Sequence, residues 1–184
     1  MRSSRFATAI AVASVILAGC SSSGTTASHQ VYGPSGHQFS IAFPSTPKSQ
    51  SNTTGLLTGL PSGSKAYGYD VSPDANIFSS AALPVPRPPT YGVIALVMPS
   101  TQIAKSFLQT LSQTPGVTAF AVSGLTGYRF LGSERTINDA NRISDPSASE
   151  GVLFLDRGAT VYVVEVITAQ LAVAKAFLAS FRTA

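Results

Sequence analysis

The chain has 184 residues, of which 44% are hydrophobic and only 11% are charged, and its formal net charge is +4 at pH 7. Basic residues are scattered singly rather than gathered in runs, so the sequence does not indicate a nucleic-acid-binding surface. A single cysteine excludes an intramolecular disulfide and leaves no second thiol for a redox or metal pair. The length suits one ordinary domain with a core of its own.

The first 19 residues have the layout of an export signal. Arg2 and Arg5 give a positively charged start, an apolar run follows from Phe6 to Ile16, and small residues come next. The apolar run is too short to span a bilayer, which takes about 20 apolar residues. We therefore expect residues 1–19 to be a cleaved signal peptide.

The end of this signal, Leu17-Ala18-Gly19-Cys20, resembles the lipobox of bacterial lipoproteins. The resemblance implies that diacylglycerol alkylates the Cys20 thiol, that cleavage occurs just before Cys20, and that its new amino group can be acylated, for example with palmitate. Two or three acyl chains hold a protein at a membrane far more firmly than one chain does. The membrane is thus the first expected partner, and the expected location is its extracytoplasmic face. An ordinary secretory signal is the alternative.

Residues 20–36 are predicted to be a flexible tether from the lipidated cysteine. Serine, threonine and glycine leave too little apolar surface there to offset the entropy of ordering the chain. Cleavage would also take away two of the twelve basic residues, so that ten remain against eight acidic ones. Residues 37–184 are predicted to form a single α+β domain.

The first half of this domain is predicted to contain three extended elements and one proline-rich crossing. A strand is expected at 37–44, whose alternating apolar residues are Phe39, Ile41 and Phe43. Another is expected at 66–71, and the continuous apolar run at 91–98 suits a central strand buried on both faces. Between them, residues 83–89 are rich in proline and cannot supply a regular hydrogen-bond ladder. That stretch is either a stiff crossing or a ligand for a proline-binding module.

A helix is predicted next, opened by Ser100 as its capping residue and ended by Pro115-Gly116. Its apolar residues follow helical spacing: Ile103, Phe107, Leu108 and Leu111. Strands at 117–122 and 128–131 follow, and then a polar loop from 138 to 149.

The last part of the chain is predicted to be a hairpin and a helix. Val152 to Leu155 and Thr160 to Thr168 form the strands, joined by a turn at 156–159. The closing helix is expected from Ala169 to about Phe181. Its apolar side consists of Leu171, Ala174, Phe177, Leu178 and Phe181.

Two separated segments resemble a known family. They are Phe39-Ser40-Ile41-Ala42-Phe43-Pro44-Ser45-Thr46-Pro47 near the start, and Tyr162-Val163-Val164-Glu165-Val166 with Phe177-Leu178-Ala179-Ser180-Phe181 at the end. Together they resemble PsbP-like bacterial proteins, among them mycobacterial lipoproteins of the Lpq series. Eight arginines against four lysines and abundant alanine also hint at a GC-rich actinobacterial source. The resemblance implies an antiparallel β-sheet packed with helices, in a noncatalytic accessory or binding domain, and it brings no motif of functional residues.

The sequence contains no common hydrolase, nucleotide-binding or zinc-protease motif. His37 is the one histidine that a fixed site could use as a general base, because His29 lies in the expected tether. Asp70 and Asp74 form a close pair of carboxylates of the kind that glycosidases need, but Asp74 lies in an expected turn, where carboxylates commonly bond to the local backbone. A small envelope hydrolase or transferase that uses His37 or a carboxylate pair is therefore the alternative function.

One charged residue stands out: Glu165 lies within the apolar run from Val161 to Ile167, where it is expected to share a face with Val161 and Ile167. A carboxylate there needs a partner, because a buried charge costs several kcal/mol unless it is paired. Arg129 and Arg135 are the candidate partners from neighbouring strands. The group is either a fold-specifying ion pair or part of a ligand-binding cleft. No spacing of His, Cys, Asp and Glu indicates a metal site, and no cofactor is expected.

The leading interpretation is a lipid-anchored extracytoplasmic binding or accessory module of the cell envelope. It would bind a membrane protein, or a lipid or glycolipid, through a cleft between sheet and helix. A third interpretation is a structural surface antigen, with O-glycosylation between Ser21 and Ser28. A cavity for an apolar ligand would draw on the aromatic residues Tyr67, Tyr69, Phe78, Tyr91, Phe120, Tyr128 and Tyr162.

Overall fold

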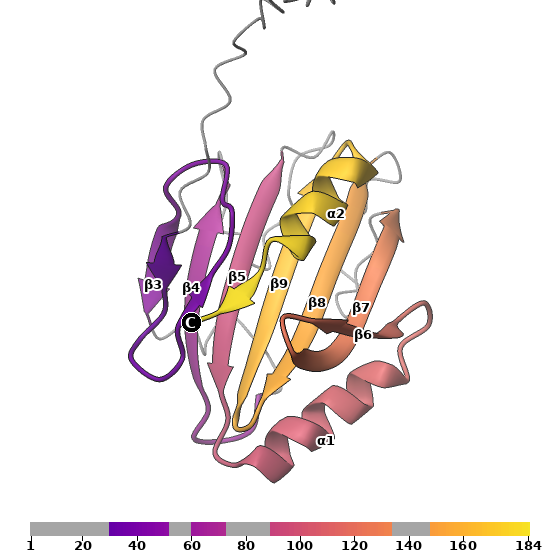
Figure 1. Ribbon diagram of the computed structural model, residues 1–184. Coiled ribbons are helices and arrows are strands. Elements are labelled where there is room, and N and C mark those ends of the chain that lie inside the picture. The colour runs from indigo at the N-terminus through magenta and orange to yellow at the C-terminus, as the bar shows by residue number, and fades with distance from the viewer. Residues whose placement is uncertain (1–29, 52–59, 73–88, 134–147) are drawn as a thin grey trace, which may run out of the picture.

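The computed structural model describes residues 30–51, 60–72, 89–133 and 148–184. Within these ranges an antiparallel sheet of seven strands forms the centre of the molecule (Figure 1). In their order across the sheet, the strands are β3 Lys48–Ser51, β4 Lys65–Val71, β5 Thr90–Val97, β9 Thr160–Thr168, β8 Ser149–Arg157, β7 Leu125–Ser133 and β6 Thr118–Val122. A small sheet in the order β1-β2-β10 consists of β1 Val31–Tyr32, β2 Phe39–Ser40 and β10 Arg182–Thr183. The helices are α1 Thr101–Ser112 and α2 Leu171–Ala179, and the predicted α+β class with an antiparallel sheet is confirmed.

The centre of the large sheet is apolar on both faces. β5 pairs with β4 and β9 along its whole length, and its residues from Gly92 to Leu96 are all buried. The predicted central strand is therefore confirmed. β8 and β9 form the predicted hairpin, but β8 continues to Arg157 and the turn is only Gly158-Ala159. Asp156 accordingly lies in a strand and not in the turn.

One face of the large sheet is covered by the small sheet and α2, which lie in front of it in Figure 1. The Phe39 ring stacks on Phe181 at 5.8 Å between centroids and meets Tyr162 edge-on at 5.9 Å. Regular pairing in the predicted strand at 37–44 is confined to Phe39–Ser40. Its three alternating apolar side chains are nevertheless all buried in this core, as the pattern predicts: Phe39, Ile41 and Phe43.

The helix α2 docks through its last two turns and is shorter than predicted. Leu178 lies against Gly151 of β8 so closely that a Cβ on this glycine would come within 2.7 Å of Leu178 Cδ1. Leu171 was expected on the packed side but is 41% exposed, because it is the first residue of the helix and precedes the docked turns. The buried residues of the helix are Ala174, Phe177 and Leu178.

The folded domain begins earlier than predicted, so the tether boundary at residue 36 is wrong. Val31 and Tyr32 pair with β2, and the Tyr32 ring packs 5.3 Å from Phe43 between centroids. Burial of this ring raises the pKa of Tyr32. The ring also supplies an apolar contact that the composition of residues 20–36 does not reveal. Cys20, the expected signal peptide and the start of the tether lie outside the described residues, as do most of the proline-rich stretch and of the loop predicted at 138–149.

The opposite face of the sheet is covered in part by α1. Ser100 caps this helix as predicted, since its hydroxyl oxygen accepts a hydrogen bond from the Ile103 backbone at 3.3 Å. The buried side of α1 packs on the sheet residues that point away from α2, and the main members of this second core are Ile94, Leu96, Ala104, Leu108, Leu111 and Phe154. In the described part of the chain, no helix is long and apolar enough to cross a membrane.

The hairpin of β6 and β7 folds across the end of the sheet near α1 (Figure 1). Its turn is Ser123-Gly124, where both residues have positive φ (53° and 77°), as two-residue hairpin turns require. β7 therefore begins at Leu125, three residues before the predicted strand. A Cβ on Gly127 would lie 1.9 Å from the Phe154 carbonyl oxygen, so only glycine permits this close approach of β7 to β8.

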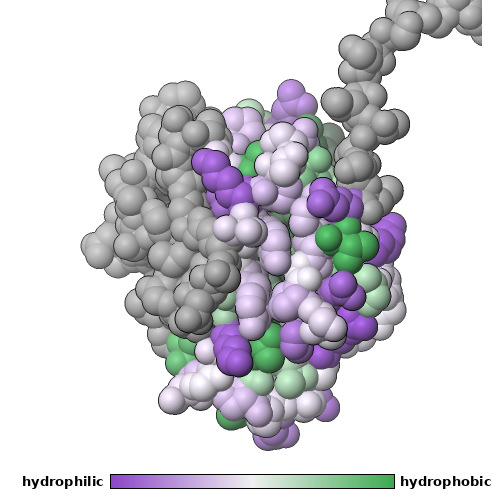
Figure 2. All heavy atoms as spheres, turned by 90° about the vertical axis from the view of Figure 1, so that its left-hand side faces the viewer, coloured by the Kyte–Doolittle hydropathy of each residue, from purple (hydrophilic) through white to green (hydrophobic). Residues whose placement is uncertain are grey.

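The surface seen from the β3 side is polar and weakly charged. Figure 2 shows purple and pale residues over most of the described surface there, with green residues scattered singly. Among the described residues, the large hydrophobic side chains that are exposed, Val31 and Leu171, belong to separate elements. Single exposed apolar residues are ordinary on soluble domains, so the described part of this side does not suggest a docking surface.

Candidate ligand-binding groove

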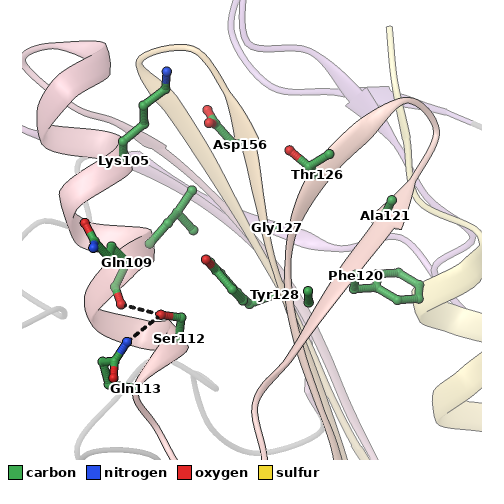
Figure 3. A pocket seen from close by; sticks show the side chains of 12 residues that line it. Lys105, Gln109, Ser112, Gln113, Phe120, Ala121, Thr126, Gly127, Tyr128 and Asp156 are labelled. Atoms are coloured by element: carbon green, nitrogen blue, oxygen red, sulfur yellow. Dashed lines mark hydrogen bonds between the residues drawn. The ribbon is translucent and has the colours of Figure 1, made fainter.

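A groove of about 820 Å³ lies between α1 and the β6–β7 hairpin (Figure 3). Its volume falls within the range of small-molecule sites. The helix contributes Lys105, Leu108, Gln109 and Ser112, followed by Gln113; the hairpin contributes Ala119, Phe120, Ala121, Thr126, Gly127 and Tyr128; β8 contributes Asp156. Most of these side chains are polar, which distinguishes the groove from the two cores.

The helix wall of the groove follows from the amphipathic pattern of α1. Lys105, Gln109 and Ser112 recur at helical spacing beside the buried Leu108, so they line the rim of the packed stripe. The Ser112 hydroxyl donates to the Gln109 backbone carbonyl at 2.6 Å, and Gln113 Nε2 donates to Ser112 Oγ at 3.1 Å. Ser112 is therefore occupied by local hydrogen bonds.

The hairpin wall owes its hollow shape to small residues. Thr126 and Tyr128 alternate with Gly127 along β7, so both side chains lie on the face that looks toward α1. Directly opposite them in β6 are Ala121 and Ala119. Two alanines beside a threonine and a tyrosine leave open space where larger side chains would close the gap to the helix.

Asp156 is the most informative residue of the groove, and the sequence analysis missed it. It follows Val152 and Phe154 at a spacing of two along β8, so it lies on the same face of the sheet and pairs with Thr126. Its Oδ1 atom is buried without a hydrogen-bond partner, although the side chain as a whole is partly exposed. A carboxylate oxygen deprived of both water and protein donors is costly.

The two charged residues of the groove lie at the same end of it. Figure 3 shows Lys105 and Asp156 there, with the Thr126 hydroxyl beside them. Lys105 and Asp156 do not form an ion pair within 4.0 Å in the described part of the chain. The Lys105 ammonium and the Asp156 carboxylate thus line the same space without pairing with each other.

The structure separates Glu165 from Arg129, one of its two predicted partners. Glu165 stands opposite Val152 on the α1 side of the sheet, on the predicted strand face. Arg129 stands opposite Leu153, the next residue of β8, and so points to the other face. Its guanidinium carbon lies 4.4 Å from the centre of the Phe120 ring, a cation–π contact. Arg129 is therefore not the partner of Glu165, since the sheet lies between them; Arg135 is outside the described residues.

The predicted catalytic candidates do not meet in the groove. His37 Nδ1 and Thr160 Oγ1 lie 2.7 Å apart and share a hydrogen bond. Asp70 is buried in β4 at 2% exposure, and Asp74 lies outside the described residues. None of His37, Asp70 and Glu165 lines the groove. Among the described residues, no group of three or more His, Cys, Asp and Glu side chains is placed to hold a metal ion.

The aromatic residues proposed for a cavity have different positions. Phe120 and Tyr128 line the groove, whereas Tyr162 is completely buried in the first core. Tyr67, Tyr69 and Tyr91 pack against that same core, and Phe78 lies outside the described residues. The groove thus contains few of these aromatic side chains, because most of them are used in packing.

Comparisons of the chain with protein-family models, with curated proteins and with solved structures found no significant match.

Proposed function

We propose that the chain is a lipid-anchored extracytoplasmic binding module of the cell envelope, built on a PsbP-like domain, and that the groove between α1 and the β6–β7 hairpin is its binding site. The observation that carries the proposal is the groove itself, with a partly buried carboxylate, Asp156, whose Oδ1 has no donor. A polar ligand that enters the groove would compensate this charge. The antiparallel sheet with helices on both faces is compatible with a PsbP-like architecture.

Binding is favoured over catalysis by the chemistry of the lining. Among the described residues, the groove is lined by neither histidine nor cysteine, and its one carboxylate is that of Asp156. Glycoside hydrolysis needs two carboxyl groups about 5–9.5 Å apart, and acyl transfer needs a nucleophile next to a base. The groove supplies hydrogen-bonding groups and two charges without such a pair, which is the composition of a recognition site.

The polarity also selects among the expected partners. The lining combines apolar surface with a lysine, amides, hydroxyls and a carboxylate, and an acyl chain offers those polar groups no hydrogen-bond partner. The polar headgroup of a lipid or glycolipid is the ligand that suits it. A membrane protein that inserts a side chain into the groove is the alternative.

The membrane anchor is tested by changing the predicted lipidated cysteine. We expect the mature wild-type protein to begin at Cys20, to carry the added mass of diacylglycerol, and to fractionate with membranes. Cys20→Ala should lose both the added mass and the membrane association, because a domain without acyl chains has no comparable hold on the bilayer. Intact-mass spectrometry and membrane fractionation of both proteins measure this. Identical fractionation of the two proteins would contradict the anchor.

The binding site is tested by a matched pair of substitutions on one helix. Gln109→Ala removes an amide that lines the groove, and Gln102→Ala removes the same side chain from an exposed position of α1 outside it. Native mass spectrometry with envelope lipids should show weaker retention for Gln109→Ala alone. Equal retention by both variants would place the ligand elsewhere. Crosslinking to a membrane protein without any retained lipid would support the alternative partner.

A further inference from the structure

We propose that the groove recognises a zwitterionic headgroup, in which an ammonium group contacts Asp156 and an anionic group such as a phosphate contacts Lys105. This inference rests on the proposed function, because it names the ligand chemistry of the same site. The ligand would be of the phosphoethanolamine type, with its two charges separated by a short uncharged link.

Asp156 indicates the cationic part of the ligand. Its Oδ1 atom is inaccessible and has no donor, so the protein leaves the negative charge largely uncompensated on that side. Compensation must therefore come from the groove, where the remaining exposed part of the carboxylate can be reached. An ammonium group carries the opposite charge and up to three N–H donors, and charge-assisted hydrogen bonds are about twice as strong as neutral ones.

Lys105 indicates the anionic part. It is exposed on α1, lines the same end of the groove as Asp156, and makes no ion pair or hydrogen bond in the described part of the chain. A purely cationic ligand would be repelled by Lys105, and a purely anionic ligand by Asp156. A ligand that carries both charges satisfies both residues at once.

The rest of the lining fits the uncharged part of such a molecule. Thr126 presents a hydroxyl beside the two charges, and Tyr128 presents a phenol further along the groove (Figure 3). Leu108 adds an apolar surface to the lining. In the part of the chain that the structure describes, no other charged side chain lines the groove. Specificity would therefore depend on Lys105 and Asp156, with the neutral residues excluding water around them.

The test is a titration of the mature protein, held in an uncharged polyoxyethylene detergent, with phosphoethanolamine. Ethanolamine, glycerol 3-phosphate and a neutral disaccharide serve as comparison ligands, and calorimetry measures each Kd. We expect phosphoethanolamine to bind at least tenfold more tightly than either half-charged compound. Asp156→Asn and Lys105→Gln should each weaken it tenfold or more, whereas Lys175→Gln, which removes an exposed lysine of α2, should not.

The source of the headgroup is tested with vesicles. Vesicles that contain phosphatidylethanolamine and vesicles of phosphatidylglycerol alone are compared for retention of the Cys20→Ala protein. Preference for the former supports a lipid source, and equal retention together with binding of free phosphoethanolamine supports a soluble source. Tight binding of the disaccharide alone, or phosphoethanolamine binding that survives both groove substitutions, would overturn the zwitterion inference while the binding function stands. Failure of every probe and of every envelope lipid to bind would instead overturn the proposed function.

Discussion

The two faces of the seven-stranded sheet are closed in different ways. On the face covered by α2 and the small sheet, aromatic rings pack around Phe39. Ala184 is held there as well, because Arg157 donates to its carbonyl at 3.1 Å. On the face covered by α1, the helix packs over Leu96 and Phe154 but leaves a groove beside Tyr128.

Under the proposed function, this difference would assign stability to one face of the domain and ligand binding to the other. The aromatic core joins β1 and β2 near the start of the described chain to α2 and Phe181 near its end, so it fixes the overall fold. The α1 face has fewer aromatic contacts and ends in a polar space that contains a poorly compensated carboxylate. Polar groups without partners lower stability, and they are typically tolerated where a ligand supplies the missing contact.

The largest expected effect comes from the aromatic core. Phe39→Ala removes a completely buried ring whose centroid lies 5.5 Å from that of Tyr69 and 5.8 Å from that of Phe181. Because the surrounding rings cannot all close the cavity, the free energy of unfolding should fall by about 3–5 kcal/mol. Urea unfolding followed by circular dichroism measures this. The control is Leu171→Ala in α2, which removes a side chain that is 41% exposed and should cost less than about 1 kcal/mol.

A smaller loss of stability, combined with loss of binding, is expected from the hairpin that walls the groove. A methyl group at Gly127 would collide with the Phe154 carbonyl oxygen, and backbone cannot move aside as a side chain can. Gly127→Ala should therefore cost about 1–3 kcal/mol and displace Thr126 and Tyr128. Gly132→Ala is the matched control, since its methyl group would meet only the Phe130 ring at 3.3 Å. Equal effects of the two substitutions on stability and on ligand binding would contradict the role of the close strand approach.

The helix wall can be weakened without touching the groove. Ser100→Ala removes the side-chain acceptor for the Ile103 N–H and should lower the free energy of unfolding by about 1 kcal/mol. Hydrogen exchange should show the loss first in the opening turn of α1, because a cap acts locally. Unchanged protection of that turn would show that packing of Ala104 alone fixes the start of the helix.

Much of this architecture could be predicted because local patterns and tertiary packing agree. The apolar run of β5 and the Ser100 cap of α1 each produced the structure that their pattern indicates. The predicted boundaries were wrong where the contact that stabilises a segment comes from residues distant in sequence. Tyr32 is ordered by Phe39 and Tyr69, which no composition argument near residue 32 can reveal.

The candidate site was harder to predict than the fold. Asp156 beside Arg157 and Gly158 has the composition of a turn, but the strand continues through it. The signal that could have found it is the alternation Val152, Phe154, Asp156, which puts the carboxylate on an otherwise apolar face. The prediction that Arg129 pairs with Glu165 rests on the proximity of their strands alone. The face of the sheet to which a side chain points depends on the register between neighbouring strands. The turns set this register, so it became known only from the strand pairing in the structure.

The smallest expected change in stability has the opposite sign, and it bears most directly on the difference between the two faces. Asp156→Asn keeps the shape of the side chain but removes the poorly compensated charge, so the ligand-free protein should be as stable as the wild type or slightly more so, by up to about 1 kcal/mol. Thermal unfolding without ligand measures this. A carboxylate that the fold needed would give the reverse result, a loss of 1 kcal/mol or more. A gain in stability for Asp156→Asn would fit the proposed binding role of the groove, whereas the loss expected for Phe39→Ala reflects packing on the other face.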